Sequence, residues 1–193
     1  MLIPGKPLKH GASSAPSLSP QQIRTTLRDM ARAAEQQVIG VTMASMDELT
    51  LLSNRHGFTA LAQLGLDACQ QLEIPATLLF FDLDHFKHIN YLYGRAEGDD
   101  ALKTFADVLR IAFRESDVVG RLADDEFGVL LTGSSAVELG AIKARIEEIL
   151  DERDATMRRS YEIRFSIDQI EYEPALHGSV EGMLGARDRG FSS

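Results

Sequence analysis

Hydrophobic side chains recur at two different spacings along the chain, which separates predicted helices from predicted strands. Residues 54–72 and 97–116 place apolar positions three and four apart, which predicts two amphipathic helices. Between them, the apolar run at 76–84 is short and ends in carboxylates, which is typical of a buried strand. The inward positions are expected to be Phe58, Leu61, Ala62, Cys69 and Leu72 in the first helix, and Leu102, Phe105, Ala106, Leu109 and Phe113 in the second.

The second half of the chain continues the alternation of helices and strands. Residues 118–131 form two short apolar runs around a polar centre, which predicts a β-hairpin. A helix near 135–152 and a loosely alternating strand within 161–172 follow, and the tail at 179–193 offers one short helix at most. Helices interleaved with a few strands predict an α/β (α+β) fold, in which a mixed sheet is covered by helices.

The first 46 residues differ in composition and hydrophobic pattern from the rest of the chain. Residues 1–19 are rich in Pro, Ser and Gly and are expected to form a disordered leader. A Ser-Pro pair then has the preferences of a helix start, so 20–46 is expected to be an N-terminal helix and linker before a main domain at 47–193. The apolar stripe of this helix would either pair two chains into a homodimer or pack on its own domain. The stripe consists of Ile23, Leu27, Met30 and Ala34.

Composition narrows the classes of partner and compartment. At 193 residues and 44% hydrophobic content, the chain is long enough to bury a core. The formal net charge of -9 argues against binding to nucleic acid or insertion at an anionic membrane, because both need a basic face. The single cysteine, Cys69, is expected to be a small core side chain in a reducing compartment. No apolar run approaches the ~20 residues that span a bilayer, so a cytoplasmic protein is expected.

Carboxylates gather where two of the predicted strands end. Asp82 and Asp84 close the buried strand, and residues 124–126 form the tip of the hairpin. Asp84 precedes a helix and is interpreted as its cap, whereas Asp82 still lies inside the strand. Asp82 beside Asp125 would form an oxygen-only pocket, which suits Mg²⁺ and phosphate ligands rather than zinc. The alternative is that the tip carboxylates are ordinary solvated turn residues.

Three segments resemble the diguanylate cyclase, or GGDEF, family in order and spacing: 47–58 (DELTLLSNRHGF), 80–102 (FFDLDHFKHINYLYGRAEGDDAL) and 114–131 (RESDVVGRLADDEFGVLL). The resemblance covers roughly residues 47–190. It implies a mixed, mainly antiparallel sheet flanked by helices, related to the adenylyl cyclase and polymerase palm folds. Members of the family condense two GTP molecules into cyclic di-GMP, with one GTP on each subunit of a dimer.

The resemblance also implies roles for the acidic residues. Asp82 and Asp125 would bind Mg²⁺, and Glu126 would act on the metal or on the attacking hydroxyl. Lys87 follows the phenylalanine-lysine pair of the family. Alternatively, Lys87 is an ordinary exposed lysine on a helix.

Two further pairs of residues match ligand-binding positions of the family. Asn90 and Asp99 correspond to the pair that reads guanine. Arg114 and Asp117 match the inhibitory RxxD site, where a guanidinium grips phosphate and a carboxylate accepts from the guanine edge. Their alternative interpretation is an exposed arginine at a helix end and a turn-forming aspartate. Arg121 would either assist this site or act as a cross-strand partner for the carboxylates.

The chain departs from the family at positions that decide activity. Ala123 and Asp124 stand where the signature has two glycines. If the turn needs a positive φ, alanine costs roughly 1–2 kcal/mol. The extra charge of Asp124 repels a unit negative charge ~4 Å away by about 1 kcal/mol in water, and by about 4 at an effective dielectric of 20. Tyr91 replaces a usual aspartate and Asp168 a usual glycine. The C-terminal segment 182–193 is expected to stop before the lysine and arginine that the family usually has there.

These departures predict a degenerate, catalytically inactive GGDEF domain. It would bind cyclic di-GMP, at the RxxD site or in the vestigial nucleotide pocket, as a bacterial second-messenger receptor or signalling module. Two alternatives remain. One is an active diguanylate cyclase that converts two GTP to cyclic di-GMP, and the other is a dimerising interaction module that binds no nucleotide.

Overall fold

The computed structural model describes residues 44–134, 137–157 and 159–190. The predicted leader at 1–19 and nearly all of the predicted helix and linker at 20–46 lie outside these residues. The proposed domain boundaries therefore stay predictions.

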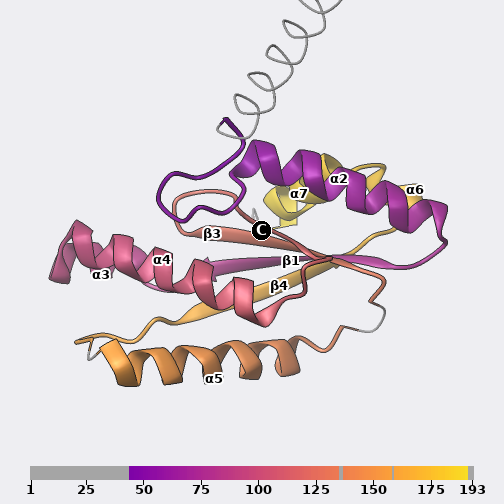
Figure 1. Ribbon diagram of the computed structural model, residues 1–193. Helices are drawn as coiled ribbons and strands as arrows, with labels where there is room; N and C mark the ends of the chain where they lie inside the picture. The colour runs from indigo at the N-terminus through magenta and orange to yellow at the C-terminus, as the bar shows by residue number, and fades with distance from the viewer. Residues whose placement is uncertain (1–43, 135–136, 158, 191–193) are drawn as a thin grey trace, which may run out of the picture. The chain divides into compact units, whose positions relative to one another are not determined.

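Four strands form an antiparallel sheet in the order β2-β3-β1-β4 (Figure 1). The strands are β1 (Ala76–Leu83), β2 (Val118–Arg121), β3 (Glu126–Thr132) and β4 (Phe165–Glu171). β1 pairs with both β3 and β4, so its unbroken apolar run lies in the interior of the sheet. The predicted mainly antiparallel sheet, its buried strand and its hairpin are confirmed.

Helices cover both faces of this sheet (Figure 1). They are α2 (Arg55–Gln71), α3 (Phe86–Tyr93), α4 (Arg95–Ala112), α5 (Leu139–Met157), α6 (Pro174–His177) and α7 (Val180–Gly190). Because alternate side chains of a strand point to opposite faces, β1 contributes to two hydrophobic layers. Leu79 and Phe81 pack with α4 and α5, whereas Leu78 and Phe80 pack with α2 and α7. Within the described residues, no helix is long and apolar enough to cross a membrane.

The buried face of α2 differs in part from the predicted one. Phe58 and Cys69 are buried as predicted, but Leu61 and Leu72 are 49% and 68% exposed, so their inward placement was wrong. Leu66 is buried instead. At 3.6 residues per turn, Leu61 lies roughly 90° from the centre of the buried stripe, and Leu72 falls after the last helical residue.

The turn from β1 into α3 also corrects a prediction. The N-cap of α3 is His85, in the left-handed region with φ 57°, and it makes no side-chain capping bond. Asp84 is therefore not the cap, because the helix begins one residue later than expected. Its carboxylate instead accepts a hydrogen bond of 2.7 Å from the Ser166 hydroxyl on β4.

Candidate functional site

A hollow of about 600 Å³ lies between α3, α4 and the loop that joins β2 to β3. Its lining consists of Phe86, Lys87, Asn90, Arg95, Asp99, Leu102, Arg121, Ala123, Asp124 and Asp125. The fold thus brings together four residues predicted for nucleotide or metal binding: Lys87, Asn90, Asp99 and Asp125. We call this the nucleotide-side hollow.

Close packing of α3 against α4 positions the Asn90 side chain. Gly98 lies directly against Asn90, and a Cβ at this position would clash with Asn90 Oδ1. Gly94, with φ 92°, allows the sharp turn between the two helices. Asn90 and Asp99 are consequently held on adjacent helices beside one hollow. An amide and a carboxylate together offer the donors and acceptors that a guanine edge requires.

The hairpin tip shows no strain at the position of the missing glycine. Among the described residues, positive φ at non-glycine positions occurs only at Leu51, Glu73 and His85. The condition for strain at Ala123, a positive φ, is therefore not met. The chain turns through residues 122–125, and so it avoids the positive φ that the tightest hairpin turns demand.

Arg121 fastens the hairpin to the loop that precedes α2. Its Nη1 donates to both carboxylate oxygens of Asp47, each at 3.1 Å, and its Nη2 donates to the Asp124 carbonyl at 2.6 Å. Burial alone would raise the pKa of Asp47. Hydrogen bonds from Thr50 and the contact with Arg121 outweigh burial, so this pKa is lowered overall. Arg121 thus pairs with Asp47, and with the backbone rather than the carboxylates of the tip.

On the other side of the sheet end, Asp82 and Glu126 form a cross-strand pair. Arg187 of α7 forms an ion pair with Asp82, and its Nη1 lies 3.2 Å from Glu126 Oε2. The guanidinium also lies over the Phe80 ring, 4.8 Å from the centroid. α7 thus brings one basic side chain, Arg187, against these acids. That the chain stops before the usual lysine and arginine of the family stays a prediction.

Burial and the charge of Arg187 have the largest effects on the pKa of Asp82, and the neighbouring carboxylates add smaller ones. Burial raises the pKa of Asp82 above its usual value, and the positive charge of Arg187 opposes the rise. Negative charge on Glu126, Asp125 and Asp168 raises it further. Asp168, which replaces a glycine of the family pattern, therefore adds to the density of negative charge here.

Carboxylates suit Mg²⁺ chemically, but the described side chains do not converge on one ion. Within the described residues, no three His, Cys, Asp or Glu side chains form a group that could hold a metal. Asp125 lines the nucleotide-side hollow, whereas Asp82 and Glu126 contact Arg187. The residues as placed do not fit a metal ion unless Arg187 moves, and the metal-binding role of Asp82 and Asp125 stays a prediction.

A second hollow, of about 300 Å³, contains the RxxD residues. Its lining consists of Ala112, Phe113, Arg114, Asp117, Leu131, Ser134, Ala141, Ile142 and Arg145. Arg145 comes from α5, and it was not singled out from the sequence because an exposed arginine on a helix has no distinguishing pattern. We call this the RxxD hollow.

Asp117 holds the turn at the edge of the RxxD hollow. Its carboxylate accepts from the Arg114 backbone N–H at 3.0 Å and from the Thr132 N–H at 3.3 Å. Asp117 is therefore a turn-forming residue, as one of its two interpretations held. A carboxylate has about four acceptor sites, so these bonds do not exhaust its capacity.

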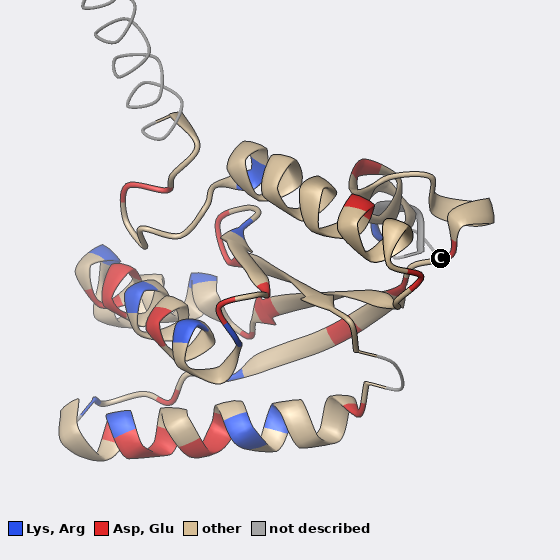
Figure 2. Cartoon of the chain, turned by 45° about the vertical axis from the view of Figure 1, so that its right-hand side comes forward, with Lys and Arg blue, Asp and Glu red and all other residues tan. Residues whose placement is uncertain are grey.

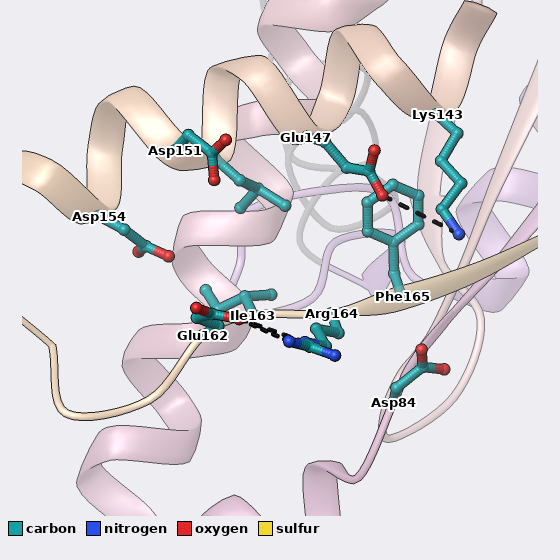
Figure 3. A pocket seen from close by; sticks show the side chains of 10 residues that line it. Asp84, Lys143, Glu147, Asp151, Asp154, Glu162, Ile163, Arg164 and Phe165 are labelled. Carbon is teal, nitrogen blue, oxygen red and sulfur yellow. Dashed lines mark hydrogen bonds and ion pairs between the residues drawn. The ribbon is translucent and has the colours of Figure 1, made fainter. Parts of the chain in front are cut away.

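A third hollow, of about 420 Å³, lies between α5 and the segment leading into β4 (Figure 3). It is lined by Asp84, Lys143, Glu147, Leu150, Asp151, Asp154, Glu162, Ile163, Arg164 and Phe165. Lys143 pairs with Glu147 on α5, and Arg164 pairs with Glu162 on the segment leading into β4 (Figure 3). Both ion pairs are exposed and none of the predicted site residues lies here, so we assign this hollow no function.

Comparison with known proteins identifies the family of this chain. Residues 44–189 match the family model of the diguanylate cyclase GGDEF domain, and the chain belongs to this family. It is 31% identical over 144 residues to the probable diguanylate cyclase DgcC of Escherichia coli K12, an overlap of 75% of this chain and 39% of that protein. The chain thus spans about two fifths of the length of this relative.

Solved structures show the same fold. The coiled coil and GGDEF domain of DgcB from Caulobacter crescentus, in complex with c-di-GMP, matches with a TM-score of 0.67 at 23% identity, over 89% of this chain and 94% of that one. The GGDEF domain of YfiN (TpbB) from Pseudomonas aeruginosa matches with a TM-score of 0.60 at 31% identity, over 72% of this chain and 88% of that one. The predicted fold is therefore confirmed.

Proposed function

We propose that this chain is a cyclic di-GMP receptor, a GGDEF domain whose cyclase centre is impaired and which binds cyclic di-GMP at the RxxD hollow. One observation carries the proposal. The fold gathers Arg114 and Asp117, from the turn between α4 and β2, and Arg145, from α5, around a single hollow.

The chemistry of this hollow suits a guanine dinucleotide. A guanidinium binds phosphate through paired hydrogen bonds and stacks on a planar base. Arg114 and Arg145 are both exposed, so their charges are accessible to a ligand. Asp117 supplies a carboxylate that accepts from the guanine edge. On a chain with a net charge of -9, such local cations are needed to hold an anionic ligand.

The nucleotide-side hollow offers less to a triphosphate. Of the three cations in its lining, Arg121 already pairs with Asp47. Lys87 and Arg95 then face three lining carboxylates, one of which is the additional Asp124. This balance disfavours GTP, whose phosphates carry several negative charges, and supports an impaired cyclase.

Titration calorimetry with cyclic di-GMP and with GTP tests the proposal. Arg114→Ala should weaken cyclic di-GMP binding by about 2–4 kcal/mol, or roughly 30- to 1,000-fold in Kd, because it removes a charged contact to phosphate. Asn90→Ala should leave this Kd unchanged. Arg164→Ala is the matched control, because Arg164 is an exposed arginine outside the RxxD hollow.

Each contrary result points to a different function. Loss of binding in Asn90→Ala alone would place the ligand in the nucleotide-side hollow. Absence of binding by both ligands would overturn the receptor proposal and leave an interaction module that binds no nucleotide.

An active diguanylate cyclase is the second candidate. It is supported by the assembly of Lys87, Asn90 and Asp99 around one hollow, and by the basic side chain that α7 brings to Asp82. Turnover of GTP with Mg²⁺ decides between the two. Robust production of cyclic di-GMP that is abolished by Asp82→Ala would establish the cyclase, whereas production only after Asp124→Gly would support the impaired centre.

A further inference from the structure

The carboxylate pair at the end of the sheet is already bound to a cation from its own chain. Arg187 contacts both Asp82 and Glu126, through different nitrogens of one guanidinium. The Arg187 side chain is only 10% exposed, and the Phe80 ring covers one of its faces. Two carboxylates and an aromatic ring therefore hold the Arg187 guanidinium in place.

The charges of Arg187, Asp82 and Glu126 compensate one another. We call the region around these three residues the acidic corner. A largely buried arginine is tolerated only when its charge is matched, and here two carboxylates and a π-system match it. Conversely, Asp82 and Glu126 are cross-strand neighbours that would repel each other without a cation between them. Asp168 adds a third negative charge close by. The corner therefore requires positive charge, and Arg187 supplies it.

Arg187 and a divalent metal would use the same oxygen atoms. The guanidinium contacts Asp82 Oδ2 and Glu126 Oε2. Mg²⁺ demands oxygen ligands at about 2.0–2.1 Å in octahedral geometry, which leaves no room for a guanidinium on those oxygens. A metal between these carboxylates requires Arg187 to leave.

We propose that Arg187 is an internal counter-cation that takes the place of a divalent metal between Asp82 and Glu126, so that metal binding and the contact of Arg187 with these carboxylates exclude each other. This inference goes beyond the proposed function and does not depend on binding of cyclic di-GMP. The position of the Arg187 side chain then decides whether Asp82 and Glu126 accept a metal.

Metal binding by the 193-residue chain is the direct test, with Mn²⁺ as the probe and the free ion measured by electron paramagnetic resonance. Arg187→Gln keeps a polar side chain and removes the charge, so Mn²⁺ should bind at least about tenfold more tightly than to the wild type. Arg164→Gln, which removes an equal charge from an exposed pair, should bind Mn²⁺ as the wild type does. Equal affinity in Arg187→Gln and wild type, or weaker binding in the variant, would overturn the proposal.

Thermal unfolding keeps the test decisive if the variant is unstable. Without metal, Arg187→Gln should have a lower Tm than the wild type, and Mn²⁺ should restore it. The double variant Asp82→Asn/Arg187→Gln should recover part of the lost Tm without metal and gain nothing from Mn²⁺. A lowered Tm that Mn²⁺ does not raise would show a purely structural ion pair and would contradict the proposal.

Discussion

The two ends of the β2–β3 hairpin differ in whether the arginines near them are already paired with carboxylates. One end is the tip, at residues 122–125, and the other is the open end, where β2 begins and β3 ends. At the tip, the guanidinium groups of Arg121 and Arg187 are engaged by carboxylates of the same chain. At the open end, Arg114 and Arg145 are exposed, and neither forms an ion pair with any other described residue. Figure 2 shows that basic and acidic positions are also interleaved along α5, so the difference is local rather than a property of the whole surface.

The contrast shows that the availability of charge matters more than its presence. A guanidinium that already binds two carboxylates must lose them before it can bind phosphate, whereas an exposed guanidinium loses only water. On this ground, the open end is the better anion site, although the tip contains more of the family signature. The following predictions separate the two ends, from the largest expected effect to the smallest.

Asp47→Ala should remove the contact that holds the hairpin tip and so destabilise the fold, without changing the residues at the open end. The change removes the partner of Arg121 and two hydrogen bonds from Thr50, and it should lower the free energy of unfolding by about 2–3 kcal/mol. Urea denaturation measures this loss. Glu162→Ala is the control, because its pair with Arg164 is exposed and should contribute less than about 1 kcal/mol. Equal losses in the two variants would contradict the importance of the Arg121 contact.

Arg145→Ala should weaken the binding of cyclic di-GMP at the open end without affecting the fold. Kd for cyclic di-GMP should rise about tenfold, or about 1.4 kcal/mol, because one of two guanidinium groups is lost. The free energy of unfolding should not change, since Arg145 is exposed. Lys143→Ala, two residues earlier on α5 and lining a different hollow, should bind as the wild type does. A Kd that does not change in Arg145→Ala would remove Arg145 from the site.

Asp124→Gly should relieve repulsion in the nucleotide-side hollow alone. GTP affinity should rise by about 1 kcal/mol, or roughly fivefold, as expected for the removal of one negative charge near phosphate in water. Binding of cyclic di-GMP at the open end should not change. Asp124→Asn separates charge from size and should reproduce most of the gain, which calorimetry with GTP would measure. A gain in glycine but none in asparagine would assign the effect to bulk.

The fall of stability at acid pH should depend on Asp47, the partner of Arg121 at the hairpin tip. Because the folded state lowers the pKa of Asp47 below its usual 3.8, the carboxylate stabilises the fold above this pH. That contribution is lost as the pH falls below 3.8 and through the lower pKa of the folded state. Asp47→Asn should therefore show a shallower fall of Tm with acidification. Parallel curves for the two proteins would show that Asp47 is not the titrating group.

Much of the fold follows from patterns that are local in the sequence. The continuous apolar run around Phe81 predicts a strand buried on both faces, and period-3.6 patterns predict α2 and α4, because these repeats depend on backbone geometry alone. The family segments predict a shared binding site for Lys87, Asn90 and Asp99, and these residues line one hollow, although their role stays a prediction. The same patterns misplaced Leu61, since a helix face is decided by what packs on it.

The partners of the charged side chains depended on tertiary structure. The sequence indicated acids at Asp82 and Asp125, but strand alternation and the docking of α7 direct Asp82 toward Arg187, which is 105 residues away. Arg145 likewise lines the same hollow as Arg114 only because α5 packs beside α4. Local periodicity carries information about which face a residue occupies. Which charge it meets depends on how distant helices settle on the sheet, and that is decided by the packing of the whole core.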